Sequence, residues 1–141
     1  MSKIAVVYWS GTGNTEAMAK AVLEGVKSGG ADGELFMSGE FDASMLSSYD
    51  AVAFGCPAMG AEMLEDFEFE PLYESCRPSL SGKKLGLFGS YGWGNGEWMR
   101  SWEESCRQSG AVLVGEGVIC SGYPEAENIE SCRNLGRSLI N

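Results

Sequence analysis

Continuous apolar runs mark the strands of this chain. Residues 4–8, 51–56 and 84–89 consist mostly of apolar residues and glycine, without the alternation of a strand that has one face in water. Such runs predict strands buried on both faces, as in parallel sheets. Two weaker segments, residues 33–37 and the run beginning at residue 111, predict a short second strand and the start of a fifth.

Apolar residues recur at helical spacing between the strands. Residues 17–26 predict a first helix that ends at the glycine pair 29–30. Pro71 suits the first turn of a short helix that runs through residue 76. Segment 38–49 is polar and predicts irregular structure with a single helical turn. The apolar faces of two further helices are predicted by Trp98, Trp102 and Cys106, and by Ile129, Cys132, Leu135 and Leu139. We interpret both tryptophans as core residues.

Strands that alternate with helices through short turns predict a parallel sheet with helices on both faces. We expect residues 1–141 to form one α/β domain, a doubly wound five-stranded sheet of strand order 2-1-3-4-5. In that order, ligands bind beyond the carboxyl ends of strands 1, 3 and 4. Unusual turns follow residues 9, 56 and 89, at those three ends. Their coincidence predicts a single binding site there.

Composition narrows the class of protein. The chain has 10 Lys and Arg against 20 Asp and Glu, a net charge of −10, and no His. This balance argues against nucleic-acid and membrane partners and favours basic protein surfaces. We expect no membrane span and no signal peptide. The five cysteines form no CxxC pair, which favours a reducing cytoplasm, small core residues and no metal site.

The turn over residues 9–15 has the composition of a phosphate cradle. Gly11 and Gly13 let its backbone bend sharply and approach a ligand closely. The N–H groups of such a turn converge at a helix N-terminus, where anions are favoured. Additional neutral donors are Ser10, Thr12, Asn14 and Thr15. Because the turn contains no Lys or Arg, it suits a monoester phosphate better than a triphosphate with Mg²⁺.

Two familiar motifs are absent from this turn. Glu16 stands where a dinucleotide fingerprint needs its third glycine, and the Gly-Lys pair of a nucleoside-triphosphate loop is missing. Taken alone, this turn could also be a plain strand–helix connection that binds no phosphate.

The other two turns offer side chains that suit a flat ring. Met59 lies among small residues in the second turn, and Trp93 lies between glycines in the third. A thioether and an indole on opposite sides form a slot for an electron-rich ring, and Tyr91 either covers an edge of that ring or packs. Together with the cradle, the slot predicts FMN as the ligand. The alternative is that Met59 and Trp93 are ordinary core residues.

These turns resemble a known family. The segments YWSGTGNTE, GCPAMG-E and LFGSYGWG-GEWM are similar to the three FMN-binding loops of short-chain flavodoxins, and the similarity runs from Lys3 to the last helix. The resemblance implies a flavodoxin-like fold, phosphate binding by the first loop, Met59 under the inner flavin face and Trp93 on the outer face. Glu62 matches a carboxylate that accepts from the flavin N3–H, and Ser90 a serine near the phosphate. The implied cofactor-binding set is Ser10, Gly11, Thr12, Gly13, Asn14, Thr15, Pro57, Ala58, Met59, Gly60, Glu62, Ser90, Tyr91, Gly92 and Trp93.

The resemblance also implies a function. Flavodoxins carry single electrons between redox enzymes through a stabilised neutral semiquinone, and they turn over no substrate. Expected partners are reductases, oxidoreductases or a hydrogenase with basic docking faces, and the chain is expected to be a monomer. The Met59–Gly60 peptide matches one that turns over on reduction. Acids near the second loop, Glu62, Glu65 and Asp66, favour a low-potential second couple, or else form a solvated face. Pro57, Ala61 and Asn95 depart from residues seen in some relatives.

Two other functions are open at this point. One is an FMN-dependent NAD(P)H reductase of the same fold, which needs a nicotinamide site that the short chain does not evidently supply. The other is a signalling domain phosphorylated on an aspartate. That domain needs an acid at the end of the third strand, where this chain has Cys56.

Overall fold

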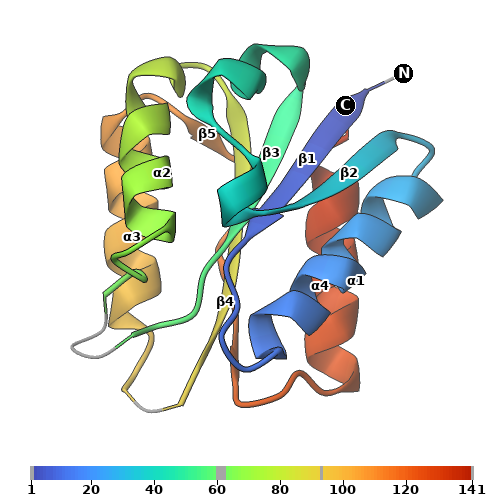
Figure 1. The fold of residues 1–141 in the computed structure, drawn as a ribbon. Coiled ribbons are helices and arrows are strands. Elements are labelled where there is room, and N and C mark those ends of the chain that lie inside the picture. The colour runs from blue at the N-terminus through green and yellow to red at the C-terminus, as the bar shows by residue number, and fades with distance from the viewer. Residues whose placement is uncertain (1, 60–62, 93, 141) are drawn as a thin grey trace.

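The computed structural model describes residues 2–59, 63–92 and 94–140, and Figure 1 shows its strands flanked by helices. The strands are β1 (Lys3–Tyr8), β2 (Asp32–Met37), β3 (Ala51–Gly55), β4 (Lys84–Tyr91), β5 (Val112–Leu113) and β6 (Val118–Ser121). The α-helices are α1 (Asn14–Ser28), α2 (Phe69–Cys76), α3 (Glu97–Gln108) and α4 (Ala126–Ser138). Short 3₁₀ helices are η1 (Ser38–Glu40), η2 (Ala43–Ser48) and η3 (Arg77–Ser79).

The sheet is parallel in every described pairing, and its order β2-β1-β3-β4-β5 confirms the predicted one. The sequence predicted a single fifth strand, but the structure has two short strands, β5 and β6, beside β4. There β5 pairs with the start of β4 and β6 with its end, in the registers Lys84↔Val112 and Phe88↔Val118. Glu103 of α3 holds the intervening segment, since its carboxylate accepts the Gly117 N–H at 2.6 Å. The eight-residue β4 is therefore covered by two short strands.

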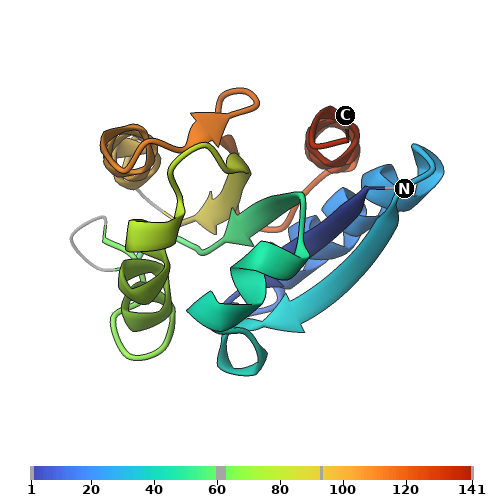
Figure 2. The same cartoon turned by 90° about the horizontal axis from the view of Figure 1, so that it is seen from above.

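The helices cover the sheet on both faces, as predicted. Viewed from above, α2 and α3 lie on one side of the sheet and α1 and α4 on the other (Figure 2). Two glycines allow α1 and α4 to pack closely: a Cβ on Gly25 would collide with the Arg133 carbonyl, and one on Gly136 with the Val22 carbonyl. Small residues at these crossing points bring the two helix backbones together.

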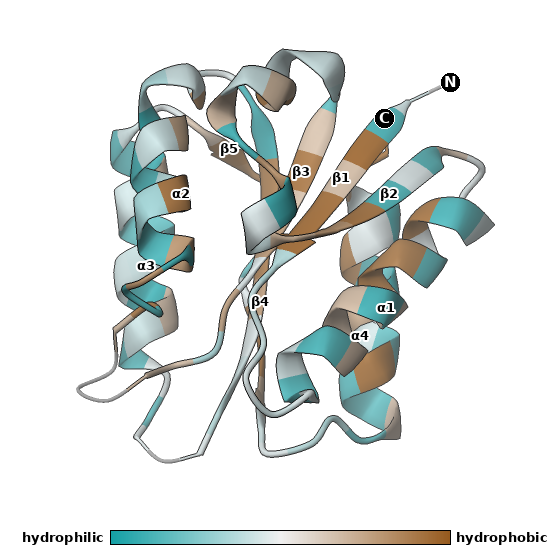
Figure 3. Cartoon of the chain, in the orientation of Figure 1, coloured by the Kyte–Doolittle hydropathy of each residue, from teal (hydrophilic) through white to brown (hydrophobic). Residues whose placement is uncertain are grey.

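Each face of the sheet carries a hydrophobic core. Successive residues of β1 alternate between the two, with Ile4 and Val6 in the α1–α4 core and Ala5 and Val7 in the α2–α3 core. Figure 3 shows the apolar strands enclosed by helices whose outer surfaces are polar.

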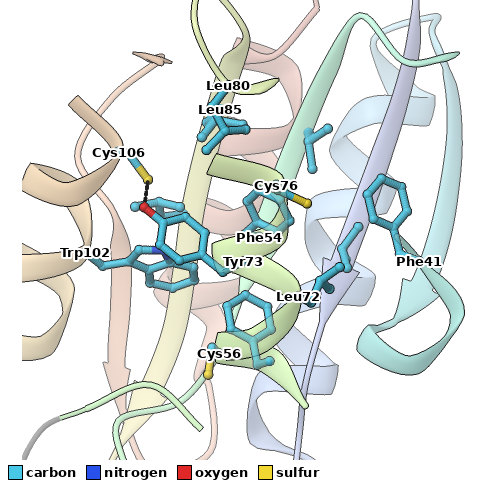
Figure 4. Packing of buried hydrophobic residues seen from close by; sticks show 14 of the residues in the cluster. Phe41, Phe54, Cys56, Leu72, Tyr73, Cys76, Leu80, Leu85, Trp102 and Cys106 are labelled. Atoms are coloured by element: carbon cyan, nitrogen blue, oxygen red, sulfur yellow. Dashed lines mark hydrogen bonds between the residues drawn. The ribbon is translucent and has the colours of Figure 1, made fainter. Parts of the chain in front are cut away.

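The α2–α3 core confirms the interpretation of the tryptophans. Trp98 and Trp102 are each 2% exposed, and Trp102 lies edge-on to Phe69 and Tyr73. The Tyr73 hydroxyl lies 3.4 Å from the Cys106 sulfur and joins α2 to α3 (Figure 4). All five cysteines are free and buried, which confirms their role as core residues.

In the described ranges, none of the helices combines the length and the apolar character needed to cross a lipid bilayer.

Candidate cofactor-binding site

Three loops meet beyond the carboxyl ends of β1, β3 and β4, as predicted from the strand order. They enclose a cavity of about 260 Å³. Most of its walls are residues predicted for the cofactor site. The lining residues are Trp9, Gly11, Thr12, Asn14, Pro57, Ala58, Met59, Ser90, Tyr91, Gly92 and Gly122.

Ser10 organises the first loop. Its hydroxyl oxygen accepts the backbone N–H groups of Gly13 at 3.1 Å and Glu16 at 3.2 Å. Gly13 has φ 97°, a left-handed conformation that costs glycine little and turns the chain into α1. Because the Ser10 oxygen accepts two bonds, its own proton is left to donate. Ser10 and Gly13 therefore shape the loop from outside the cavity lining.

The first loop leaves several donors without acceptors. Among the described residues, the backbone N–H groups of Gly11, Thr12, Asn14 and Thr15 donate no hydrogen bond. Asn14 and Thr15 open α1, where such groups lack partners within the helix and the helix dipole is positive. Gly11, Thr12 and Asn14 also line the cavity. The arrangement is that of an anion site built from neutral donors.

Thr15 lies behind the cavity instead of lining it. It is 1% exposed, and its hydroxyl lies 3.0 Å from the hydroxyl of Ser90, a residue near the end of β4 that is 4% exposed. The Ser90 N–H also donates to the Thr15 hydroxyl at 3.4 Å. The Thr15 side chain therefore joins the first loop to the third, and only its backbone N–H is left for an anion.

The second loop is fixed at its start through Cys56. The Cys56 carbonyl accepts the indole N–H of Trp98 at 3.2 Å, and its sulfur accepts the Glu65 N–H at 3.3 Å. Burial raises the pKa of the Cys56 thiol to about 12, so the thiol stays protonated and unreactive. Ala58 then donates its N–H to the Ser90 carbonyl at 2.9 Å, which ties the second loop to the third.

Met59 presents its side chain at the cavity. It is 37% exposed, and its N–H donates to the Met63 carbonyl at 2.8 Å in an isolated bridge. On the third loop, the Tyr91 ring packs against Trp98 with ring centroids 5.5 Å apart, and the Tyr91 backbone carbonyl accepts the Gly122 N–H at 2.9 Å. Met59 and Tyr91 thus stand on loops that are both anchored to Trp98.

Some predicted site residues lie outside the described ranges. These are Gly60, Glu62 and Trp93. Two residues of the cavity were missed from the sequence, Trp9 and Gly122. Trp9 is the first residue of the glycine-rich turn over residues 9–15, and Gly122 directly follows β6. Both residues follow the carboxyl end of a strand, which is where ligands bind in parallel sheets, and this position could have identified them from the sequence.

Glu65 has a different setting from the one expected of a surface acid near the second loop. It is 5% exposed, and its carboxylate accepts the N–H groups of Phe67, Glu68 and Phe69 at 2.8–2.9 Å. Burial opposes its ionisation, but these three bonds together outweigh burial and lower the pKa of the Glu65 carboxyl. Glu65 therefore holds the chain that leads into α2.

The residues present fit FMN. Unpaired N–H groups at the start of α1 suit a phosphate monoester, and the adjoining cavity between Met59 and Tyr91 suits a flat ring.

A family model described as flavodoxin matches residues 6–136 of this chain. The chain belongs to the flavodoxin family. It is 44% identical to the flavodoxin of Megasphaera elsdenii over 135 residues, 96% of each chain. To the flavodoxin of Clostridium beijerinckii it is 42% identical over 136 residues, 96% of this chain and 98% of the relative. The solution structure of two-electron reduced Megasphaera elsdenii flavodoxin superimposes with a TM-score of 0.89 at 45% identity, covering 96% and 97% of the two chains.

Family membership decides between the functions left open by the sequence. Flavodoxins bind FMN and transfer electrons to redox partners, and they are not enzymes with a substrate of their own. This flavodoxin-family chain is therefore an FMN-binding electron carrier, and the reductase and signalling-domain alternatives are set aside.

Proposed function

We propose that residues 1–141 form a single-domain, low-potential carrier of single electrons that holds FMN non-covalently in the three-loop cavity. The observation that supports this proposal is a set of four backbone N–H groups that donate no hydrogen bond within the described part of the chain, beside a cavity bounded by Met59 and Tyr91. The residues proposed to hold FMN are the fifteen named from the sequence, joined by Trp9 and Gly122.

The phosphate end of the site is assigned to the first loop. The N–H groups of Gly11, Thr12, Asn14 and Thr15 would donate to the phosphate oxygens. The Thr12 hydroxyl and the Ser10 hydroxyl, whose proton is left to donate, would add two donors. Because these donors are neutral, affinity comes from hydrogen bonds and the dipole of α1. The Thr15–Ser90 bond keeps this loop in register with β4.

The ring end of the site is assigned to the second and third loops. As the resemblance implies, Met59 would contact one ring face and Trp93 the other, and Glu62 would accept the ring N3–H. Bound FMN supplies one-electron redox chemistry, and the protein sets its potential by packing, hydrogen bonding and charge. Proline at position 57 removes one N–H donor from the start of the second loop.

The acidic surface is proposed to lower the potential of the second electron. A carboxylate about 10 Å from a site raises the energy of added negative charge by on the order of 1 kcal/mol, or tens of millivolts for one electron. Asp66 and Glu68 are exposed close to the second loop. The same charge favours partners with basic docking faces, and it disfavours nucleic acid. We propose a monomer that works in the cytoplasm.

Spectroelectrochemical reduction of the FMN-loaded protein tests this proposal. We expect two separate one-electron steps, the second at the lower potential. Asp66→Asn should raise the second midpoint by tens of millivolts, whereas Asp32→Asn at the start of β2 should leave it unchanged. A single two-electron step would contradict one-electron transfer. Equal shifts in the two variants would contradict the role given to the acids near the second loop.

A further inference from the structure

The segment between the second loop and α2 carries an aromatic side chain that is exposed to solvent. Phe67 is 88% exposed, and Met63, four residues earlier, is 52% exposed. Exposed Phe forfeits the gain from burying its ring, and neighbouring exposed apolar side chains commonly mark interaction sites. Phe67 lies in the turn 66–68, outside the cavity described above.

The turn that carries Phe67 is held firmly. The Glu65 carboxylate accepts the N–H groups of Phe67 at 2.9 Å and of Glu68 and Phe69 at 2.8 Å, and the Glu65 carbonyl accepts the Glu70 N–H at 2.8 Å. Glu65 itself is buried. A partner that contacts Phe67 therefore meets a turn whose backbone is already ordered, which reduces the entropy lost on binding.

Acids surround this aromatic side chain. Asp66 and Glu68 flank it and are exposed, and the chain contains no Lys or Arg from Pro57 to Cys76. Beside Met63, a groove of about 270 Å³ between α2 and α3 is lined by Glu70 and Glu74. We name Met63, Asp66, Phe67, Glu68 and Glu70 the Phe67 patch. It combines two exposed apolar side chains with acids that are close to them in the sequence.

One residue of the Phe67 patch, Met63, is bonded to the cofactor site. Met63 pairs through its carbonyl with the N–H of Met59, which lines the three-loop cavity. Phe67 therefore lies only four residues along the chain from a residue that is bonded to the loop carrying Met59. Nearness of this kind is what electron transfer between two proteins requires.

We infer that the Phe67 patch docks an electron-transfer partner whose contact face has an apolar pocket ringed by Lys and Arg. The inference rests on the proposed carrier function, because that function requires an electron-transfer partner. The acids of the patch favour a partner whose contact face is basic. A second copy of this chain is the alternative occupant. It is disfavoured because each copy carries a net charge of −10 and would bring acids against acids.

A c-type cytochrome with a lysine-ringed haem edge serves as the probe. Its affinity is measured by titration calorimetry, and its reduction by the FMN-loaded, reduced protein is followed by stopped flow. Phe67→Ser should weaken binding and slow the second-order step by about tenfold, the loss typical of an aromatic anchor at the centre of an interface. The matched control Val112→Ser, 52% exposed at the opposite end of the sheet, should change either value by less than about twofold.

Charge provides a second pair of variants. Asp66→Lys should weaken cytochrome binding more than Asp32→Lys, although both change the net charge equally. A small neutral quinone should be reduced by Phe67→Ser, Val112→Ser and Asp32→Lys at the wild-type rate, since it needs no docking surface. Asp66→Lys also shifts the potential of the bound FMN, so it is compared with Asp32→Lys by cytochrome binding alone. Equal effects of Phe67→Ser and Val112→Ser on cytochrome binding would overturn the inference.

The remaining outcomes separate this inference from the carrier function. A wild-type protein that binds the cytochrome through Phe67 but reduces neither acceptor would contradict the carrier function and leave the docking surface supported. A concentration-dependent wild-type dimer that Phe67→Ser abolishes, seen by sedimentation equilibrium, would assign the patch to a second copy and overturn the inference.

Discussion

The hydroxyl oxygens of Thr15 and Ser90 lie 3.0 Å apart, although 75 residues separate them in the chain. Thr15 stands in the first turn of α1 and Ser90 near the end of β4, and both are buried. Their bond joins the loop assigned to the phosphate to the loop assigned to the ring. This buried contact therefore helps to fix the two ends of the cofactor site relative to each other.

Removing one partner of this contact should destabilise the protein. Ser90→Ala leaves the Thr15 hydroxyl buried without its side-chain partner, and should lower the free energy of unfolding by about 1–3 kcal/mol. Thr15→Val should have a similar effect. The double variant should cost less than the sum, with a coupling energy of about 0.5–3 kcal/mol. Urea unfolding of the four apoproteins measures the cycle, and strict additivity would show that the contact contributes nothing.

Glu65 should make stability depend on pH. Since its folded-state pKa is lowered, its contribution is present above the unfolded-state value of about 4.3 and is lost as pH falls through the folded value. Glu65→Gln should lower the free energy of unfolding by about 1–3 kcal/mol at pH 7, and the two proteins should converge in acid.

Urea unfolding at a series of pH values tests this expectation. Glu127→Gln, on an exposed position of α4, is the control and should cost less than about 0.5 kcal/mol at any pH. A difference between Glu65→Gln and wild type that stays constant down to pH 3 would show that ionisation of Glu65 is not its cause.

The cysteines should be inert in the native protein. Burial raises the pKa of Cys56 and Cys132 to about 12 and of Cys76 and Cys106 to about 11, and it raises that of Cys120 as well. We expect a thiol-specific disulfide reagent to react with none of the five thiols at neutral pH until the chain unfolds, and with all five afterwards. A thiol that reacts promptly in the native state would contradict this account.

Most of the fold could be predicted from local pattern. The apolar runs of β1, β3 and β4 indicate buried strands, and the helical spacing of apolar residues identified α1, α3 and α4. The division of the fifth strand could not be predicted, because it depends on a contact across the fold. The Gly117 N–H is held by Glu103, a residue of α3 that no local pattern links to it.

Most residues that line the cavity were named from the sequence, but the sequence did not indicate how each is used. The hydroxyls of the first loop all look alike in the sequence. In the folded chain, Ser10 shapes its own loop while Thr15 bonds Ser90. Likewise Glu65 looks like any other residue of an acidic run, and only folding buries it beneath the turn that carries Phe67. Such roles depend on partners distant in sequence or on burial.

The acidic surface should make partner encounter sensitive to salt. Reduction of the lysine-ringed cytochrome should slow by about tenfold or more as the ionic strength rises from roughly 0.01 to 0.5 M, because screening weakens the attraction that steers encounter. The neutral quinone is the control and should react at a constant rate. A cytochrome rate that does not change with salt would contradict a partner face defined by basic charge.

The central claim is that the unpaired N–H groups of the first loop hold a phosphate. Titration calorimetry of the apoprotein with FMN and with riboflavin tests it most directly, since the two ligands differ only in that group. Each hydrogen bond to a charged acceptor is worth about 1.5–3 kcal/mol, so FMN should bind more than about a hundredfold more tightly. Near-equal affinities for the two ligands would contradict the claim.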